Sequence, residues 1–376
     1  MTSQTDPYID IRPYNDDEIP AALDRLINDE EFISAILNYR FSNHAAWFQA
    51  IMSPILRVYL KMKWSKLQSV EAIQIEVKKY LRDTLANTTK GVTYTGLESL
   101  DQNQSYLFVS NHRDIAMDPA FVNWVRFQYG MDTLRIAIGD NLLRKPYVSD
   151  LMRLNKSFIV NRSATAPREV MKALTQLSTY IDHSIVHDDQ SIWIAQQEGR
   201  AKDGNDRTDP TILKMFYMSH RKAKRSFSEA MGRLNIVPVS ISYEYDPCDA
   251  LKANELYALQ QDGEYEKGQF EDIESIVKGI TGNKGRVHVA FGEVVRGDFE
   301  TPEAMAEEID RQIRGNYHLH SSNLIAAGCG DETSAEEQAE FNARLESVAP
   351  GAREILREMY ANPVMNQRNA KAQENS

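Results

Sequence analysis

A histidine followed closely by two acids offers the clearest acid–base chemistry in this sequence. His112 comes just after the apolar run 106–109, and Asp114 and Asp118 lie two and six residues further on. A carboxylate that accepts a hydrogen bond from an imidazole N–H fixes the ring tautomer and stabilises the imidazolium formed in a reaction. The segment therefore predicts a histidine general base with an aspartate partner. The structural alternative is a plain helix start, with Asp118 as cap and Pro119 as first helical residue.

A second group of residues suits the binding of an anion. The apolar run 191–195 leads into Glu198, Gly199, Arg200 and Lys202. A glycine lets the backbone turn close to a ligand, and two cations can point together at a phosphate group. The alternative is a charged surface loop.

Two further apolar runs each contain or end in a candidate residue. Arg162 ends the run that begins with Phe158-Ile159-Val160, and Pro238 lies within the apolar run 236–241. Both are also explained as plain sheet structure, which is the preferred interpretation for the run that contains Pro238.

The elements that would position these residues alternate in kind. Short β-rich runs separated by helical patterns predict an α/β domain with a central mixed, largely parallel sheet flanked by helices. Because the strands are mostly apolar, we expect the sheet to be covered on both faces. The predicted strands are residues 91–95, 106–109, 134–138, 158–160, 191–195, 236–241 and 286–291.

Helical spacing of apolar residues dominates the first 90 residues. We expect a helical domain over 1–90, a catalytic α/β domain over 91–330, and C-terminal helices with a frayed tail over 331–376. The apolar stretch 45–60 is expected to be bundle core, with contact at a membrane surface as the alternative. Pro54 is expected to kink or break its helix.

Composition excludes several classes of protein. The net charge of −11 argues against nucleic-acid binding, and any contact with an anionic membrane must be local. The chain has no uninterrupted apolar run of membrane-spanning length. Its two cysteines, Cys248 and Cys329, have no metal-ligand spacing, so no metal is expected and both are expected to be reduced thiols. The acidic, polar first residues do not resemble a targeting peptide, so we expect a cytoplasmic protein, peripheral at most on the inner membrane face.

Taken in order, the four runs resemble the glycerolipid acyltransferase superfamily over about residues 92–245. That superfamily includes glycerol-3-phosphate and lysophosphatidate acyltransferases. Its blocks are matched by Asn111-His112 with a downstream acid, by Arg162 after a strand, by Glu198-Gly199-Arg200, and by the strand with Pro238. The run from Trp193 is similar to the soluble plastid glycerol-3-phosphate acyltransferases, which also carry a helical domain before the catalytic one.

The resemblance implies that a fatty acyl group moves from acyl-CoA or acyl carrier protein to a hydroxyl of glycerol-3-phosphate or lysophosphatidate. His112 would be the general base, backbone N–H groups of residues 112–115 would steady the oxyanion, and no cofactor is implied besides the acyl donor. The phosphate pocket would consist of Arg162, Glu198, Gly199, Arg200 and Lys202.

One spacing departs from the family pattern. The family has its aspartate five positions after the histidine, where this chain has Met117. A bulged turn would let Asp118 serve instead, so Asp118 is preferred over Asp114 as the partner of His112. Two other functions stay open: a His/Asp hydrolase such as a thioesterase, and a peripheral lipid-binding protein with a decayed site.

Overall fold

Seven strands form at the predicted places, in a computed structural model that describes residues 6–41, 46–266, 268 and 271–374. Contacts divide the chain into two units. The first contains residues 1–80 and 135–180, and the second contains residues 81–134 and 181–376. This division follows packing rather than the predicted boundaries at residues 90 and 330, and the domain organisation stays a prediction.

The first unit is mainly helical and carries one pair of parallel strands, β3 and β4. Helices α4 and α7 run on into the second unit. Its elements are 3₁₀ helix η1 (Asp16–Glu18), α1 (Ile19–Asn28), α2 (Glu30–Arg40), α3 (Ala46–Trp64), α4 (Val70–Thr88), β3 (Arg135–Gly139), η3 (Asp140–Leu142), α6 (Pro146–Leu154), β4 (Ser157–Val160) and α7 (Pro167–Val186).

The predicted N-terminal helices pack around one apolar core. Ile19, Leu26 and Ile33 are almost fully buried there, because their helical spacing places them on one face. Helix α3 continues through Pro54, so the predicted break at this residue was wrong. Of the stretch 45–60, Ala45 lies outside the described residues. Among the described helices, none combines the length and the apolar character that a bilayer crossing demands.

The second unit contains the other five strands and most of the remaining helices. Its elements are β1 (Gly91–Thr95), η2 (Leu97–Ser99), β2 (Leu107–Ser110), α5 (Met117–Gln128), β5 (Ile192–Ala195), α8 (Pro210–Lys222), α9 (Phe227–Gly232), β6 (Ile236–Tyr243), α10 (Asp249–Asp262), α11 (Glu271–Thr281), β7 (Arg286–Phe291), α12 (Pro302–Gly315), α13 (Ser321–Ala326), α14 (Ala335–Glu346), η4 (Pro350–Ala352) and α15 (Arg353–Glu374).

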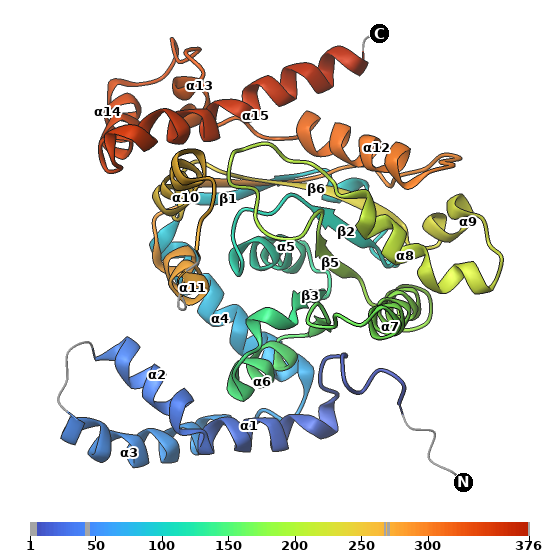
Figure 1. Ribbon diagram of the computed structural model, residues 1–376. Helices are drawn as coiled ribbons and strands as arrows, with labels where there is room; N and C mark the ends of the chain where they lie inside the picture. Colours follow the sequence, from blue (N-terminus) through green and yellow to red (C-terminus); the bar gives the residue numbers. More distant parts are fainter. Residues whose placement is uncertain (1–5, 42–45, 267, 269–270, 375–376) are drawn as a thin grey trace. The chain divides into compact units, whose positions relative to one another are not determined.

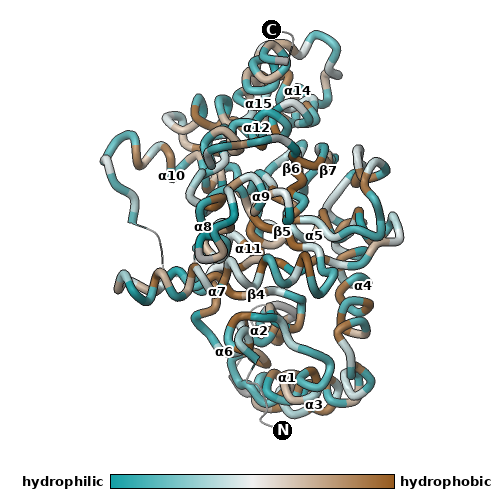
Figure 2. The backbone as a smooth tube through the Cα atoms, turned by 90° about the vertical axis from the view of Figure 1, so that its right-hand side faces the viewer, coloured by the Kyte–Doolittle hydropathy of each residue, from teal (hydrophilic) through white to brown (hydrophobic). Residues whose placement is uncertain are grey.

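The sheet of the second unit has the strand order β1-β7-β6-β2-β5. All its pairs are parallel except β6 with β7. Every residue of β2 and β6 is buried, and helices α12 and α5 cover opposite faces of these strands (Figure 1). The strands β5, β6 and β7 stand out as hydrophobic in Figure 2. The prediction of a mixed, largely parallel sheet flanked by helices is confirmed.

The C-terminal region is more ordered than predicted. Residues 353–374 form helix α15, whose Ala370 is buried, so the expected fraying of the last dozen residues was wrong for the described part. Leu356 and Tyr360 of α15 pack with Phe341 of α14 in a separate apolar cluster. The segment between β6 and β7 forms two helices, α10 and α11, which lie beside the site described next.

Candidate active site

The site begins where strand β2 ends, at Ser110. The side chain of Asn111 donates to the carbonyl of Ile241 at 3.0 Å and accepts from its N–H at 2.8 Å. This amide thereby ties the end of β2 to the middle of β6. The backbone of the next residue, His112, is fixed at the carboxyl end of the sheet, where α/β folds commonly place their functional groups.

His112 is paired with Asp118. Its Nδ1 lies 2.8 Å from Asp118 Oδ2, and the histidine side chain is 13% exposed while the aspartate is fully buried. Helix α5 begins at Met117, so Asp118 lies in its first turn rather than capping it. The short turn over residues 113–116 absorbs the extra residue. The contact uses Nδ1, which leaves Nε2 as the nitrogen that can act on a substrate.

The Asp118 carboxylate collects three more donors. Its Oδ2 accepts from the N–H groups of Arg113 at 2.6 Å and Asp114 at 3.0 Å, and Oδ1 accepts from the Tyr243 hydroxyl at 2.5 Å. Burial and the nearby Asp118 charge raise the pKa of Tyr243 well above its usual value, so it stays a donor. The N–H groups of residues 113 and 114 are therefore engaged by Asp118. An oxyanion role for the N–H groups of residues 112 and 115 stays a prediction.

Asp114 has a different environment. Its Oδ1 accepts from the N–H groups of Ala116 at 3.0 Å and Met117 at 2.9 Å, which stabilises the turn into α5. Its Oδ2 is buried without a hydrogen-bond partner. Burial, and next the charge of Asp118, raise the pKa of Asp114 to about 6. The structure thus pairs the histidine with Asp118, whereas Asp114 supports the backbone.

Buried ion pairs hold this loop from behind. The Arg113 guanidinium donates to Asp206 at 2.8 Å, and the Lys252 ammonium donates to the Arg113 carbonyl at 2.7 Å and forms an ion pair with Asp246. Burial disfavours the charged guanidinium, but Asp206 outweighs it and raises the pKa of Arg113. Sequence patterns did not indicate these partners, because each lies more than 90 positions from the loop that it supports.

The predicted anion-binding loop lies against the histidine segment. The Gln196 N–H donates to the Ser110 carbonyl at 2.8 Å, and the Ala201 N–H donates to the His112 carbonyl at 2.9 Å. Gly199 has a φ of 76°, a left-handed conformation that glycine adopts without strain. The loop after β5 is therefore fixed to the loop after β2, as the order of the sequence blocks suggests.

Two of the predicted phosphate ligands contact residues of helices α10 and α11. Arg200 donates to Ser275 of α11 at 3.3 Å, and Lys202 forms an ion pair with Glu255 of α10. Glu198 lies exposed on the same loop. Arg162 belongs to the first unit, where it follows β4 and its N–H donates to Asp140 at 3.1 Å. Its place in a shared phosphate pocket stays a prediction.

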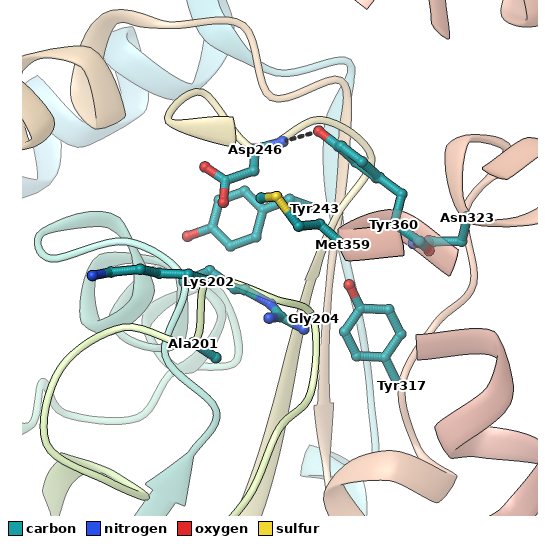
Figure 3. Close-up of a pocket in the computed structure, with 10 residues that line it drawn as sticks. Ala201, Lys202, Gly204, Tyr243, Asp246, Tyr317, Asn323, Met359 and Tyr360 are labelled. Carbon is teal, nitrogen blue, oxygen red and sulfur yellow. Dashed lines mark hydrogen bonds between the residues drawn. The ribbon is translucent and has the colours of Figure 1, made fainter. Parts of the chain in front are cut away.

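A small cavity lies beside the loop, and its lining includes Arg113, Lys202 and Asp246. Its volume of about 30 Å³ is enough for a water molecule. Figure 3 shows Tyr317 and Tyr360 along it, and Lys202 extending away from Tyr317. The Asp246 N–H donates to the Tyr360 hydroxyl at 3.0 Å.

No metal site is found among the described residues, which contain no cluster of three potential ligands. Both cysteines are free, and Cys248 is buried. Burial raises the pKa of the Cys248 thiol to about 11, which makes it a poor nucleophile. The site thus places a histidine paired with a buried aspartate at the end of a central strand, an arrangement that is capable of acid–base chemistry.

Comparison with known proteins finds a similarity over part of the chain. Residues 91–242 match the family model described as Acyltransferase, and this range contains both His112 and Asp118. Over this range, which is less than half of the chain, the sequence is similar to the Acyltransferase family, in agreement with its four sequence blocks.

Two further comparisons were made. The fold was matched to the 1-acyl-sn-glycerophosphate acyltransferase PlsC from Thermotoga maritima, with 14% identity, a TM-score of 0.40, and coverage of 79% of this chain and 95% of that chain. A search of curated protein sequences found no match.

Proposed function

We propose that this enzyme transfers a fatty acyl group from an acyl thioester to a hydroxyl of a glycerol-phosphate type acceptor, with His112 as the general base. The observation that carries the proposal is the 2.8 Å contact between His112 Nδ1 and the buried Asp118 carboxylate. A charged partner at Nδ1 favours the tautomer that leaves Nε2 free of a proton, and it stabilises the imidazolium that forms when Nε2 takes one.

The chemistry needs no covalent enzyme intermediate. His112 Nε2 takes the hydroxyl proton as the acceptor oxygen attacks the thioester carbonyl, so a C–O bond forms. The tetrahedral intermediate then collapses, the C–S bond breaks, and the imidazolium returns its proton to the departing thiolate. Thiols have a pKa of roughly 8.5, so this leaving group needs little assistance. Much of the acceleration would come from holding the two substrates together.

Arg200 and Lys202 are proposed to hold the acceptor phosphate, with Arg162 and Glu198 as further members of the pocket. This assignment is supported by the hydrogen bond that the Ala201 N–H donates to the His112 carbonyl at 2.9 Å. It anchors the loop that carries both cations beside the base. Cations that meet a phosphate dianion form strong, charge-assisted hydrogen bonds. Their present partners, Ser275 and Glu255, would have to be exchanged for phosphate oxygens.

The donor is proposed to be acyl-CoA or acyl carrier protein, with no other cofactor, and the acceptor glycerol-3-phosphate or lysophosphatidate. The two free cysteines suit a reducing compartment, which supports a cytoplasmic site of action.

A product assay tests this function. The purified protein is incubated with each donor and with both acceptors, and the products are identified by mass spectrometry. We expect an acylated glycerol phosphate, formed at a rate that depends on both substrates. Release of free fatty acid without acylated acceptor would assign a hydrolase instead, and lipid binding without turnover would assign a decayed site.

A further inference from the structure

Five large apolar side chains lie exposed along one face of helix α3. Ile51, Ile55, Val58, Tyr59 and Met62 are 54%, 54%, 60%, 57% and 73% exposed. At 100° per residue they fall within a sector of about 100°, so they form one continuous strip, called the α3 stripe below. Single exposed apolar residues are ordinary, but a contiguous group marks a surface that something covers.

The orientation of this helix is fixed by its other face. Leu60 is buried, and Met52, Leu56 and Trp64 pack against the core formed by α1 and α2. The helix is therefore apolar on both sides, and rotating it to bury the α3 stripe would expose the core residues. The exposed side is a stable property of the fold.

The charged residues of the segment that carries the α3 stripe are all basic. Residues 32–70 contain no aspartate or glutamate, although the whole chain has 54 acids in 376 residues. Lys61 flanks the stripe on one side and is exposed, as is Lys66 beyond the helix end. Lys63 flanks it on the other side, where it pairs with Glu76 at 2.8 Å and donates to the Tyr80 hydroxyl at 3.1 Å. The apolar strip thus lies in a basic region of an acidic protein.

We propose that the α3 stripe docks on an anionic lipid surface. Apolar side chains would enter the boundary between head groups and acyl chains, while Lys61 and Lys66 remain at the level of the anionic head groups. Tyr59 has the amphipathic character that such a boundary favours. A second copy of the chain fits less well, because two such helices would bring their cations together. The net charge of −11 repels the rest of the protein from the same surface, so attachment is local.

Vesicle co-sedimentation tests this proposal with the full-length protein. The probes are vesicles of phosphatidylcholine alone and vesicles that also contain phosphatidylglycerol. We expect binding to the anionic vesicles, at least tenfold weaker binding to the neutral ones, and partial release by salt. The double variant Ile55→Glu/Met62→Glu should bind anionic vesicles at least tenfold more weakly than the wild type.

Controls separate docking from folding and from catalysis. Met171→Glu replaces another exposed methionine, which lies on α7 rather than on α3 and is 50% exposed, and it should leave vesicle binding unchanged. The double variant should keep its melting temperature and its turnover of a water-soluble acceptor. Because vesicle binding and acyl transfer are measured in separate assays, a failure of the proposed acyl transfer would not be mistaken for a failure of docking. Unchanged vesicle binding by the double variant would overturn the proposal. So would a wild-type dimer, seen by analytical ultracentrifugation, that the double variant abolishes.

Discussion

Among single side chains, Asp118 has the most specific surroundings in the site. Four donors converge on its two oxygens: His112 Nδ1, two backbone N–H groups and the Tyr243 hydroxyl. An ionised carboxylate accepts hydrogen bonds only, and this set uses both of its oxygens. The residue therefore serves both to orient the base and to shape the turn that carries it.

Replacing the two aspartates separately distinguishes their roles. Asp118→Asn should lower kcat by about 10³-fold, because the imidazole loses the charge that stabilises its protonated form. Asp114→Asn should keep kcat within about tenfold. Since burial raises the pKa of Asp114 to about 6, removing its charge should raise the melting temperature more at pH 8 than at pH 5. Steady-state kinetics and thermal unfolding measure both effects, and a larger loss of kcat for Asp114→Asn would reverse the assignment.

Tyr243 is a positioning residue that acts through Asp118. Tyr243→Phe removes one donor to the carboxylate and should lower kcat by about tenfold, the usual effect of losing a hydrogen bond to a charged group. With one donor fewer, the carboxylate attracts the imidazole proton more strongly. The acid limb of the pH–rate profile should therefore move to higher pH. A profile that keeps its position while the melting temperature falls would show a purely structural role.

Glu255 competes with the acceptor for Lys202 in this account. Glu255→Gln should lower KM for the acceptor several-fold with little change in kcat, because the phosphate no longer displaces a carboxylate. The matched control is Glu264→Gln, an exposed position after α10 where no effect is expected. If KM instead rises or stays the same, Lys202 is a structural cation and does not bind the phosphate.

At the scale of elements, apolar patterns predicted the strands well and the contacts between loops poorly. The fully buried strands β2 and β6 are visible as unbroken apolar runs. The turn over residues 113–116 is not visible in this way, because its shape depends on Asp206, Asp246 and Lys252 from distant segments. Tyr243 at the end of β6 was likewise not predicted as a site residue, since a buried tyrosine at a strand end is ordinary.

Three histidines lie together beside the edge strand β1. His288 on β7 contacts the Thr93 and Thr95 hydroxyls at 2.8 and 3.1 Å, and the His318 ring lies 4.8 Å from the rings of both His288 and His320. Burial, and next the neighbouring His318, lower the pKa values of His288 and His320 to about 4. Arg286 lowers the pKa of His320 further, and Glu244 opposes this.

This cluster predicts acid-sensitive stability. An unfolded histidine has a pKa of about 6.5, so between pH 6.5 and 4 the unfolded chain binds more protons than the folded one. The stabilisation is complete above pH 6.5 and is lost as the pH falls, by about 2 kcal/mol for one such histidine at pH 5. The melting temperature of His288→Gln should therefore fall less between pH 7.5 and 5 than that of the wild type. Equal falls would exclude the cluster as the cause.

For the whole molecule, the sequence predicted the fold class and the similarity to acyltransferases, but not the way the chain divides. Contacts group residues 135–180 with the N-terminal helices rather than with the rest of the predicted catalytic domain. Arg162 therefore belongs to the first unit, and Arg200 and Lys202 belong to the second. Such a grouping depends on which surfaces pack together, and no local pattern records it.

The most direct test of the account is the effect of His112→Ala on acyl transfer. The variant should keep its melting temperature within a few degrees and lose about 10³-fold or more in kcat/KM on the acceptor found in the product assay, since only the base is removed. His187→Ala, an exposed histidine after α7, is the matched control and should behave as the wild type. A folded His112→Ala enzyme with wild-type kcat/KM would contradict the account.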